Sequence, residues 1–143
     1  MKTALVKKYM SIIFCILILC GCSSSSKGSS STNESPTFES GSELGSGKTS
    51  FKLTTDDYSG NEYIFTINTD KATVGEALSE LDFIQGEKGP YGLFIKTVNG
   101  ITADYEKDGA YWAFYIDGEY ASKSADQTEI NPQSEYSLKI ERP

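Results

Sequence analysis

The sequence of residues 51–143 predicts an α+β domain in which one helix packs on a mixed β-sheet. Three observations carry this prediction. Several short segments alternate apolar and polar residues, as strands with one buried face do. One segment near residue 73 has the apolar spacing of an amphipathic helix. An Asn99-Gly100 pair separates two apolar runs, which is the strongest short-range signal for a hairpin.

The domain begins with two predicted strands, at residues 51–55 and 62–68. Residues 57–61, which include Gly60, form the turn between them. A helix follows, because Thr73 and Glu76 have the spacing of a capping box. The apolar residues of one helix face fall at i, i+3, i+4 and i+7: Val74, Ala77, Leu78 and Leu81. Gly86 and Gly89-Pro90 are expected to close this region.

The remaining strands are predicted at residues 92–98, 101–105, 110–116 and 136–141. Asp117-Gly118 marks a second hairpin-type turn. The order is therefore two strands, one helix and then several strands. That order predicts a β-grasp-like fold, a mixed sheet wrapped across a single helix.

The N-terminal region predicts a lipoprotein signal peptide over residues 1–21. Three lysines and no acid precede an apolar run at residues 9–19, which is shorter than the about 20 residues that span a bilayer. The run ends in Leu-Cys-Gly-Cys, which resembles the bacterial lipobox and makes Cys22 the lipidated residue. The expected location is therefore extracytoplasmic, anchored to the bacterial cell membrane by lipid. An ordinary signal peptide or a short anchor with an incidental cysteine is the alternative.

Residues 22–50 are rich in Ser and Gly and have few apolar residues to bury, so they predict a flexible linker between the lipid and the domain at residues 51–143. All three cysteines lie at or before Cys22, and the chain has no histidine. The exported domain therefore lacks the residues of Cys/His zinc sites and of Ser-His-Asp or Cys-His catalytic systems.

Charge excludes a further class of partner. Residues 51–143 hold 8 Lys or Arg against 17 Asp or Glu, a net charge of −9 that repels phosphate backbones and argues against nucleic acid. Solubility at a crowded surface explains such a charge. No spacing singles out two carboxylates for acid–base work, so we expect no enzyme and no required cofactor. A carboxylate hydrolase is the least favoured alternative.

The segment at residues 104–109 resembles the start of a calcium loop, with acids at positions 1, 3 and 5 and glycine at position 6. The twelfth position, which needs a bidentate Glu, is Tyr115, and Lys107 lies among the acids. The segment therefore favours an exposed acidic turn, and no metal site is predicted. Weak calcium binding is the alternative.

Aromatic residues are concentrated between residues 91 and 120. In the strand at residues 110–116, alternation places Trp112 and Phe114 on one face and Tyr111 and Tyr115 on the other. A single helix covers one face of a sheet, so aromatics on an uncovered face would form a platform for a flat ligand or a partner. The alternative is that both faces simply pack in the core and at the edge.

These segments also carry a resemblance to a known family. The sequence GLFIKTVNGI at residues 92–101, followed by AYWAF at residues 110–114, resembles the C-terminal β-domain of transcobalamin and intrinsic factor. Bacterial lipoproteins with such a domain share the TVGEAL helix start and the YWAFYIDG segment of this chain. The resemblance covers residues 73–141.

In those carriers the β-domain closes over one face of cobalamin, and a separate helical domain holds the rest. The resemblance implies ligand contacts from residues 90–95 and 112–120. The candidate ligand-binding residues are Tyr91, Gly92, Phe94, Trp112, Phe114 and Tyr115. No segment of this sequence predicts a helical domain, and the residues after Trp112 are larger than in the carriers. The fold is therefore expected to transfer more safely than the function.

The expected function is a surface-anchored, non-enzymatic binding module, with a corrinoid as the first ligand to test. The alternative is an adhesion-type module that docks a surface protein or peptide and has no small-molecule ligand. Whether a second chain completes the site stays open, since a lone β-domain would leave half of a corrinoid in water.

Overall fold

The computed structural model describes residues 35–143. The predicted signal peptide at residues 1–21, the lipidation residue Cys22 and the first part of the predicted linker lie outside the described residues. No helix within residues 35–143 has both the length and the apolar character needed to cross a membrane.

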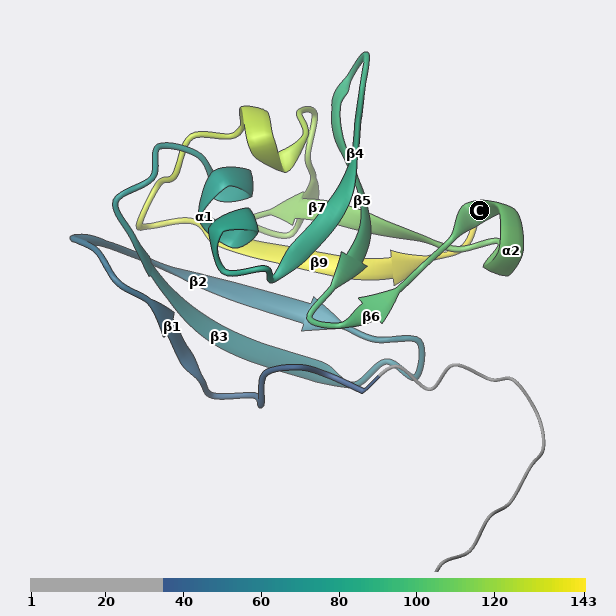
Figure 1. The fold of residues 1–143 in the computed structure, drawn as a ribbon, viewed down its shortest axis with the longest axis horizontal. Helices are drawn as coiled ribbons and strands as arrows, with labels where there is room; N and C mark the ends of the chain where they lie inside the picture. Colours follow the sequence, from purple (N-terminus) through teal and green to yellow (C-terminus); the bar gives the residue numbers. More distant parts are fainter. Residues whose placement is uncertain (1–34) are drawn as a thin grey trace, which may run out of the picture. The chain divides into compact units, whose positions relative to one another are not determined.

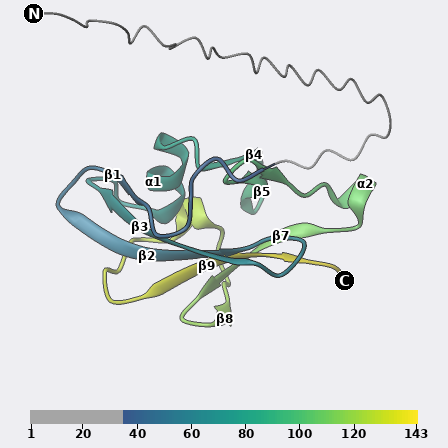
Figure 2. The same ribbon diagram turned by 90° about the horizontal axis from the view of Figure 1, so that it is seen from below.

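The larger of two sheets has six strands in the order β1-β3-β2-β9-β7-β8. Their bounds are Glu43–Gly45 (β1), Thr49–Asp56 (β2), Glu62–Thr69 (β3), Tyr111–Ile116 (β7), Glu119–Tyr120 (β8) and Glu135–Glu141 (β9). The pairs β1–β3 and β2–β9 are parallel, whereas β2–β3, β7–β9 and β7–β8 are antiparallel. The sheet is therefore mixed, as predicted, and its long central strands run side by side in Figure 2.

The smaller sheet has three strands in the order β4-β5-β6, with bounds Ile84–Gly89, Gly92–Val98 and Ile101–Thr102. Figure 1 shows this sheet, the helix α1 (Val74–Glu80) and the 3₁₀ turn η1 (Ala125–Gln127) on one side of the larger sheet. The tip of the β4–β5 hairpin projects away from that sheet. The predicted α+β class is confirmed: the domain is mostly β-sheet, with one main helix.

The predicted helix start is also confirmed. The N–H of Glu76 donates to Thr73 Oγ1 over 3.2 Å, and the N–H of Thr73 donates to Glu76 Oε2 over 3.3 Å, which completes the capping box. The buried apolar side chains of α1 are Val74, Ala77 and Leu78. They face the core that alternate residues of the large sheet form, such as Leu53, Phe65 and Leu138.

The predicted linker extends too far into the chain. Residues 43–45 form strand β1, which pairs in parallel with β3. Before it, the Phe38 N–H donates to Asn99 Oδ1 over 2.7 Å, and the Phe38 ring stacks on Phe83 with centroids 5.8 Å apart. The Ser/Gly composition hid this strand, because a three-residue strand that ends in a glycine shows no alternation. Its order comes from pairing with β3, which composition does not report.

Two further local predictions were wrong. Residues 84–89, expected to close the helix region, form strand β4, with a bulge between Gln85 and Gly86. The predicted strand at residues 101–105 ends at Thr102, and α2 (Tyr105–Asp108) follows. Asp104 caps α2, because its Oδ1 accepts from the N–H groups of Glu106 and Lys107. A side chain that competes for backbone N–H groups favours a helix start over a continued strand.

Candidate functional site

The face of β7 that carries Trp112 and Phe114 is the core face. Trp112 is 6% exposed and Phe114 is 8% exposed. The indole N–H of Trp112 donates to the Ile101 carbonyl over 3.1 Å, and Phe114 stacks on Tyr136 with centroids 6.1 Å apart. This is therefore not an uncovered face of the sheet, and Trp112 and Phe114 form no open platform on it. The sheet β4-β5-β6, whose first strand, β4, was not predicted, covers these rings.

Tyr115 lies on the opposite face of β7. Its hydroxyl donates to Glu141 Oε1, and the hydroxyl of Tyr111 donates to Glu141 Oε2 over 3.2 Å. The hydrogen bond to Glu141 and burial raise the pKa of Tyr115 to about 12, so this phenol stays protonated. The structure thus does not bring Tyr115 together with the other candidate residues.

Four of the six candidate residues line one small cavity of about 230 Å³. We call it the hairpin cleft, because the β4–β5 hairpin and the loop at residues 120–125 form its walls. The four are Tyr91, Phe94, Trp112 and Phe114. The remaining lining residues are Leu93, Ile95, Tyr111 and residues 120–125. Tyr91 is 89% exposed at the hairpin tip, whereas Trp112 and Phe114 present only the small fraction that the core leaves open.

Sequence reasoning missed most of the loop at residues 120–125, because its polar residues have no periodicity. The loop is fixed to the hairpin through Asp126, whose Oδ1 accepts from the Leu93 N–H over 2.9 Å and from Ser124 Oγ over 2.6 Å. Gly92 permits this approach: its φ is +106°, and a Cβ there would overlap the Ser124 hydroxyl. Gly92 thus makes room for Ser124 and does not line the cleft.

Acid should weaken this connection. Burial raises the pKa of Asp126, but the hydrogen bonds from Ser124 and the Leu93 N–H outweigh it, and the net pKa lies below 3.8. A carboxylate whose pKa is lower in the folded than in the unfolded state stabilises the fold at pH values above its unfolded-state pKa. That stabilisation is lost as the pH falls through the folded-state pKa. We expect Asp126→Ala to lower the free energy of unfolding by about 1 kcal/mol at pH 7, since a partly exposed carboxylate loses two donors.

Urea unfolding across pH checks this prediction. The gap between the wild type and Asp126→Ala should hold at neutral pH and shrink below about pH 3.8, where the wild-type carboxylate protonates. Asp126→Asn is the control, because it keeps one acceptor for Leu93 and cannot titrate. A gap that stays constant from pH 7 to pH 2 would contradict the assigned role of this carboxylate.

The acidic segment at residues 104–109 does not have the form of a calcium loop. Asp104 Oδ1 caps α2, and Asp104 Oδ2 pairs with Lys107 Nζ over 3.3 Å. The twelfth position, Tyr115, lies within strand β7. Within residues 35–143 no group of three or more His, Cys, Asp or Glu side chains is arranged to hold a metal ion.

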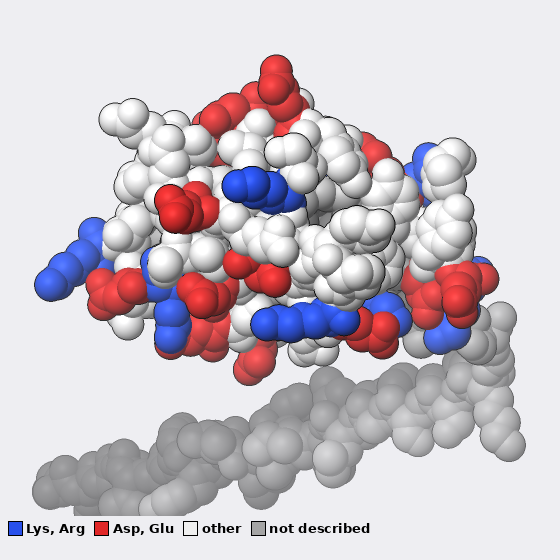
Figure 3. All heavy atoms as spheres, turned by 90° about the horizontal axis from the view of Figure 1, so that it is seen from above, with Lys and Arg blue, Asp and Glu red and all other residues white. Residues whose placement is uncertain are grey.

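Uncharged side chains prevail around the hairpin cleft. Figure 3 shows the side of the domain that carries α1 and the hairpin; uncharged side chains cover much of it, with acidic and basic groups among them. The lining of the hairpin cleft itself includes one charged side chain, Lys123. The cleft is therefore chemically an apolar and aromatic surface with a polar rim.

Comparisons with known proteins agree with this architecture. Residues 71–140 match a family model described as a domain of unknown function, DUF4430. A crystal structure from Ruminococcus gnavus ATCC 29149, described as that of a candidate metal-binding protein, is 32% identical with a TM-score of 0.63; the match covers 67% of this chain and 99% of that one. No curated protein matches the chain.

Haptocorrin in complex with Cbi is a more distant match. The identity is 18% and the TM-score is 0.53, and the match covers 66% of this chain and 25% of haptocorrin. At this identity the likeness concerns the fold alone. It supports, at the level of fold, the transcobalamin-like character expected from the segments around residues 92–101 and 110–114.

Proposed function

This chain belongs to the DUF4430 family, a domain of unknown function, and we propose that it is a non-enzymatic ligand-binding module. One observation carries the proposal. The hairpin cleft gathers Tyr91, Phe94 and the open edges of Trp112 and Phe114, although hairpin and β7 are separate in sequence. Concave aromatic surfaces with a few polar groups are the usual form of small-molecule sites.

A corrinoid is the first ligand to test. The corrin ring is flat and partly apolar, so its edge can enter between the hairpin and the loop at residues 120–125, and the polar side chains of that loop can meet its amide groups. Haptocorrin, which shares the fold, is a protein solved in complex with Cbi. The likeness supports the choice of ligand class, and the aromatic lining supports the location.

Affinity should be modest. Sites for small molecules measure roughly 300 to 1,000 Å³, whereas this cleft measures about 230 Å³. It can therefore cover only part of a corrinoid, and a second chain would have to enclose the rest. We expect a Kd in the micromolar range or weaker for the isolated protein, about −8 kcal/mol or smaller in magnitude.

The metal-binding description of the Ruminococcus gnavus protein does not transfer to the described part of this chain. A protein metal site needs several oxygen, nitrogen or sulfur ligands that converge. Residues 35–143 contain no group of three or more His, Cys, Asp or Glu side chains arranged to hold a metal ion. Metal binding is therefore not part of the proposal.

Location is proposed from the N-terminal segment. With Cys22 lipidated, the domain would stand at the outer face of the bacterial cell membrane. Two or more acyl chains give a stable anchor, whereas one holds weakly. The net charge of −9 over residues 51–143 argues against nucleic acid as a partner.

Titration of the full-length protein with cobinamide and cobalamin tests the function. Trp112 is the only tryptophan and lines the cleft, so its fluorescence should be quenched. Tyr91→Ala should weaken binding about fivefold, because an exposed aromatic contact is worth about 1 kcal/mol. Tyr105→Ala is the matched control, since Tyr105 is 54% exposed and does not line the cleft.

Exposed aromatic side chains support a second candidate function. Tyr91, Phe94 and Tyr120 are 89%, 46% and 61% exposed around the cleft. Aromatics of this kind also anchor protein partners. If millimolar corrinoid gives no signal, and candidate partner chains do not restore one, the cleft is instead a docking surface for a protein or peptide.

A further inference from the structure

A second concavity lies against strands β4 and β5 and the segment that begins α2, with a volume of about 500 Å³. We call it the acidic hollow. Its lining consists of acidic and aromatic side chains with one lysine: Glu87, Phe94, Lys96, Asp104, Tyr105, Glu106 and Tyr111. We propose that the acidic hollow binds an organic cation, an ammonium or guanidinium group carried on a carbon chain.

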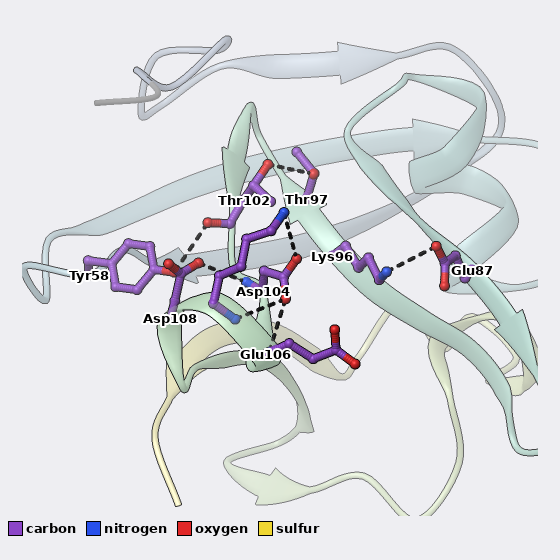
Figure 4. A network of polar contacts seen from close by, with 9 residues as sticks. Tyr58, Glu87, Lys96, Thr97, Thr102, Asp104, Glu106 and Asp108 are labelled. Carbon is purple, nitrogen blue, oxygen red and sulfur yellow. Dashed lines mark hydrogen bonds and ion pairs between the residues drawn. The ribbon is translucent and has the colours of Figure 1, made fainter. Parts of the chain in front are cut away.

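The charges of the lining favour a cation. Three carboxylates stand against one ammonium. Lys96 Nζ is paired with Glu87 Oε1 over 3.0 Å, so these two charges offset each other. Asp104 and Glu106 lie outside this pair, on the α2 side of Lys96 in Figure 4, and Lys107, which is not part of the lining, offsets the charge of Asp104. An anion would therefore meet net repulsion in this hollow, and a cation would meet net attraction.

The two remaining carboxylates differ in their partners. Asp104 Oδ2 pairs with Lys107 over 3.3 Å and Asp104 Oδ1 accepts two backbone N–H groups. The Lys107 ammonium in particular holds the pKa of Asp104 below its usual 3.8, so it is ionised at neutral pH. The Glu106 carboxylate has no ion-pair partner among residues 35–143. It is the charge most available to a ligand.

The aromatic lining selects the kind of cation. Phe94 and Tyr105 are 46% and 54% exposed, and Tyr111 completes the aromatic wall. Ring faces attract ammonium and guanidinium groups through their quadrupole and also pack against the carbon chain that carries the charge. A small metal ion gains little from such rings, and the described part of the chain has no group of three His, Cys, Asp or Glu side chains arranged to hold one. Carboxylates beside exposed rings thus suit an organic cation.

The acidic hollow and the hairpin cleft share Phe94 and Tyr111 but differ elsewhere. Glu106 and Tyr105 line only the hollow, and Tyr91 lines only the cleft. This inference therefore does not rest on corrinoid binding. Variants at these three positions separate the failure of one site from the failure of the other.

Titration of the full-length protein with two cationic probes tests the proposal. One is n-butylammonium, and the other is the blocked tripeptide acetyl-Ala-Lys-Ala-amide. Their neutral controls are n-butanol and the same tripeptide with Gln. Millimolar binding of the cationic probes, weakened by added salt and absent for the neutral controls, is the expected result. Tighter binding of the peptide would assign the natural ligand to a protein side chain, and tighter binding of the free amine would assign it to a small molecule.

Paired variants locate the site. Tyr105→Ala should weaken binding of the cationic probes about fivefold, and Glu106→Gln should weaken it about threefold. Glu62→Gln removes the same charge from an exposed position on β3 and should leave binding within experimental error, as should Tyr91→Ala. Circular dichroism and thermal melts verify that each variant folds. Equal binding of neutral and cationic probes, or equal effects of Glu106→Gln and Glu62→Gln, would overturn the proposal.

Discussion

Trp112→Ala is expected to lower the free energy of unfolding by about 3 to 5 kcal/mol, the usual cost of removing a large aromatic side chain from a core. The indole is 6% exposed and belongs to the core cluster. Its N–H also satisfies the Ile101 carbonyl across the two sheets. The substitution therefore leaves a cavity and removes the hydrogen bond that joins β7 to β6.

Urea denaturation followed by circular dichroism measures this effect, since the variant has lost the fluorophore. Trp112→Phe is the control, because it keeps an aromatic ring and loses the N–H donor; a cost of about 1 to 2 kcal/mol is expected. If Trp112→Ala unfolded at the same urea concentration as the wild type, the indole would not be in the core.

Replacing Cys22 should have an all-or-none effect on anchoring. A thioether to diacylglycerol needs the sulfur of this residue, so Cys22→Ala should take up no labelled palmitate and leave the membrane fraction or stay unprocessed. Cys15→Ala removes another sulfur from the segment predicted to be cleaved off, and its labelling should match the wild type. Equal labelling of Cys22→Ala and the wild type would refute the lipoprotein prediction.

The long elements of the fold were predictable because one face of each is buried. Strands β2 and β3 alternate buried and more exposed positions, and their apolar residues Phe51, Leu53, Phe65 and Ile67 lie on the buried face. The capping box of Thr73 and Glu76 predicted the start of the helix. These are local signals, in which the period of burial matches the period of the backbone.

The elements that sequence reasoning missed have no such period. Strand β1 has three residues, and β4 carries two glycines and exposed polar residues after Ile84. Both owe their order to pairing with a neighbouring strand. The missed β4 had a direct consequence for the site: alternation correctly divided β7 into two faces, but it could not say which face the second sheet would cover.

The candidate site was half predictable for a similar reason. Tyr91 and Phe94 stand out in sequence as aromatics near a turn. The opposite wall depends on the contact between the Leu93 N–H and Asp126, which are 33 residues apart. A glycine at position 92 is consistent with the close approach of another segment. Nothing in the sequence indicated that this segment is the one that carries Ser124.

Chemical-shift mapping of the isotope-labelled protein during a cobinamide titration tests the central claim most directly. Backbone amides of residues 91–95 and 120–125, together with the Trp112 indole N–H, should shift in proportion to bound ligand. Amides on the opposite face of the large sheet, such as those of Lys52 and Ser137, should not move. Shifts confined to that opposite face, or none at millimolar cobinamide, would contradict a ligand site in the hairpin cleft.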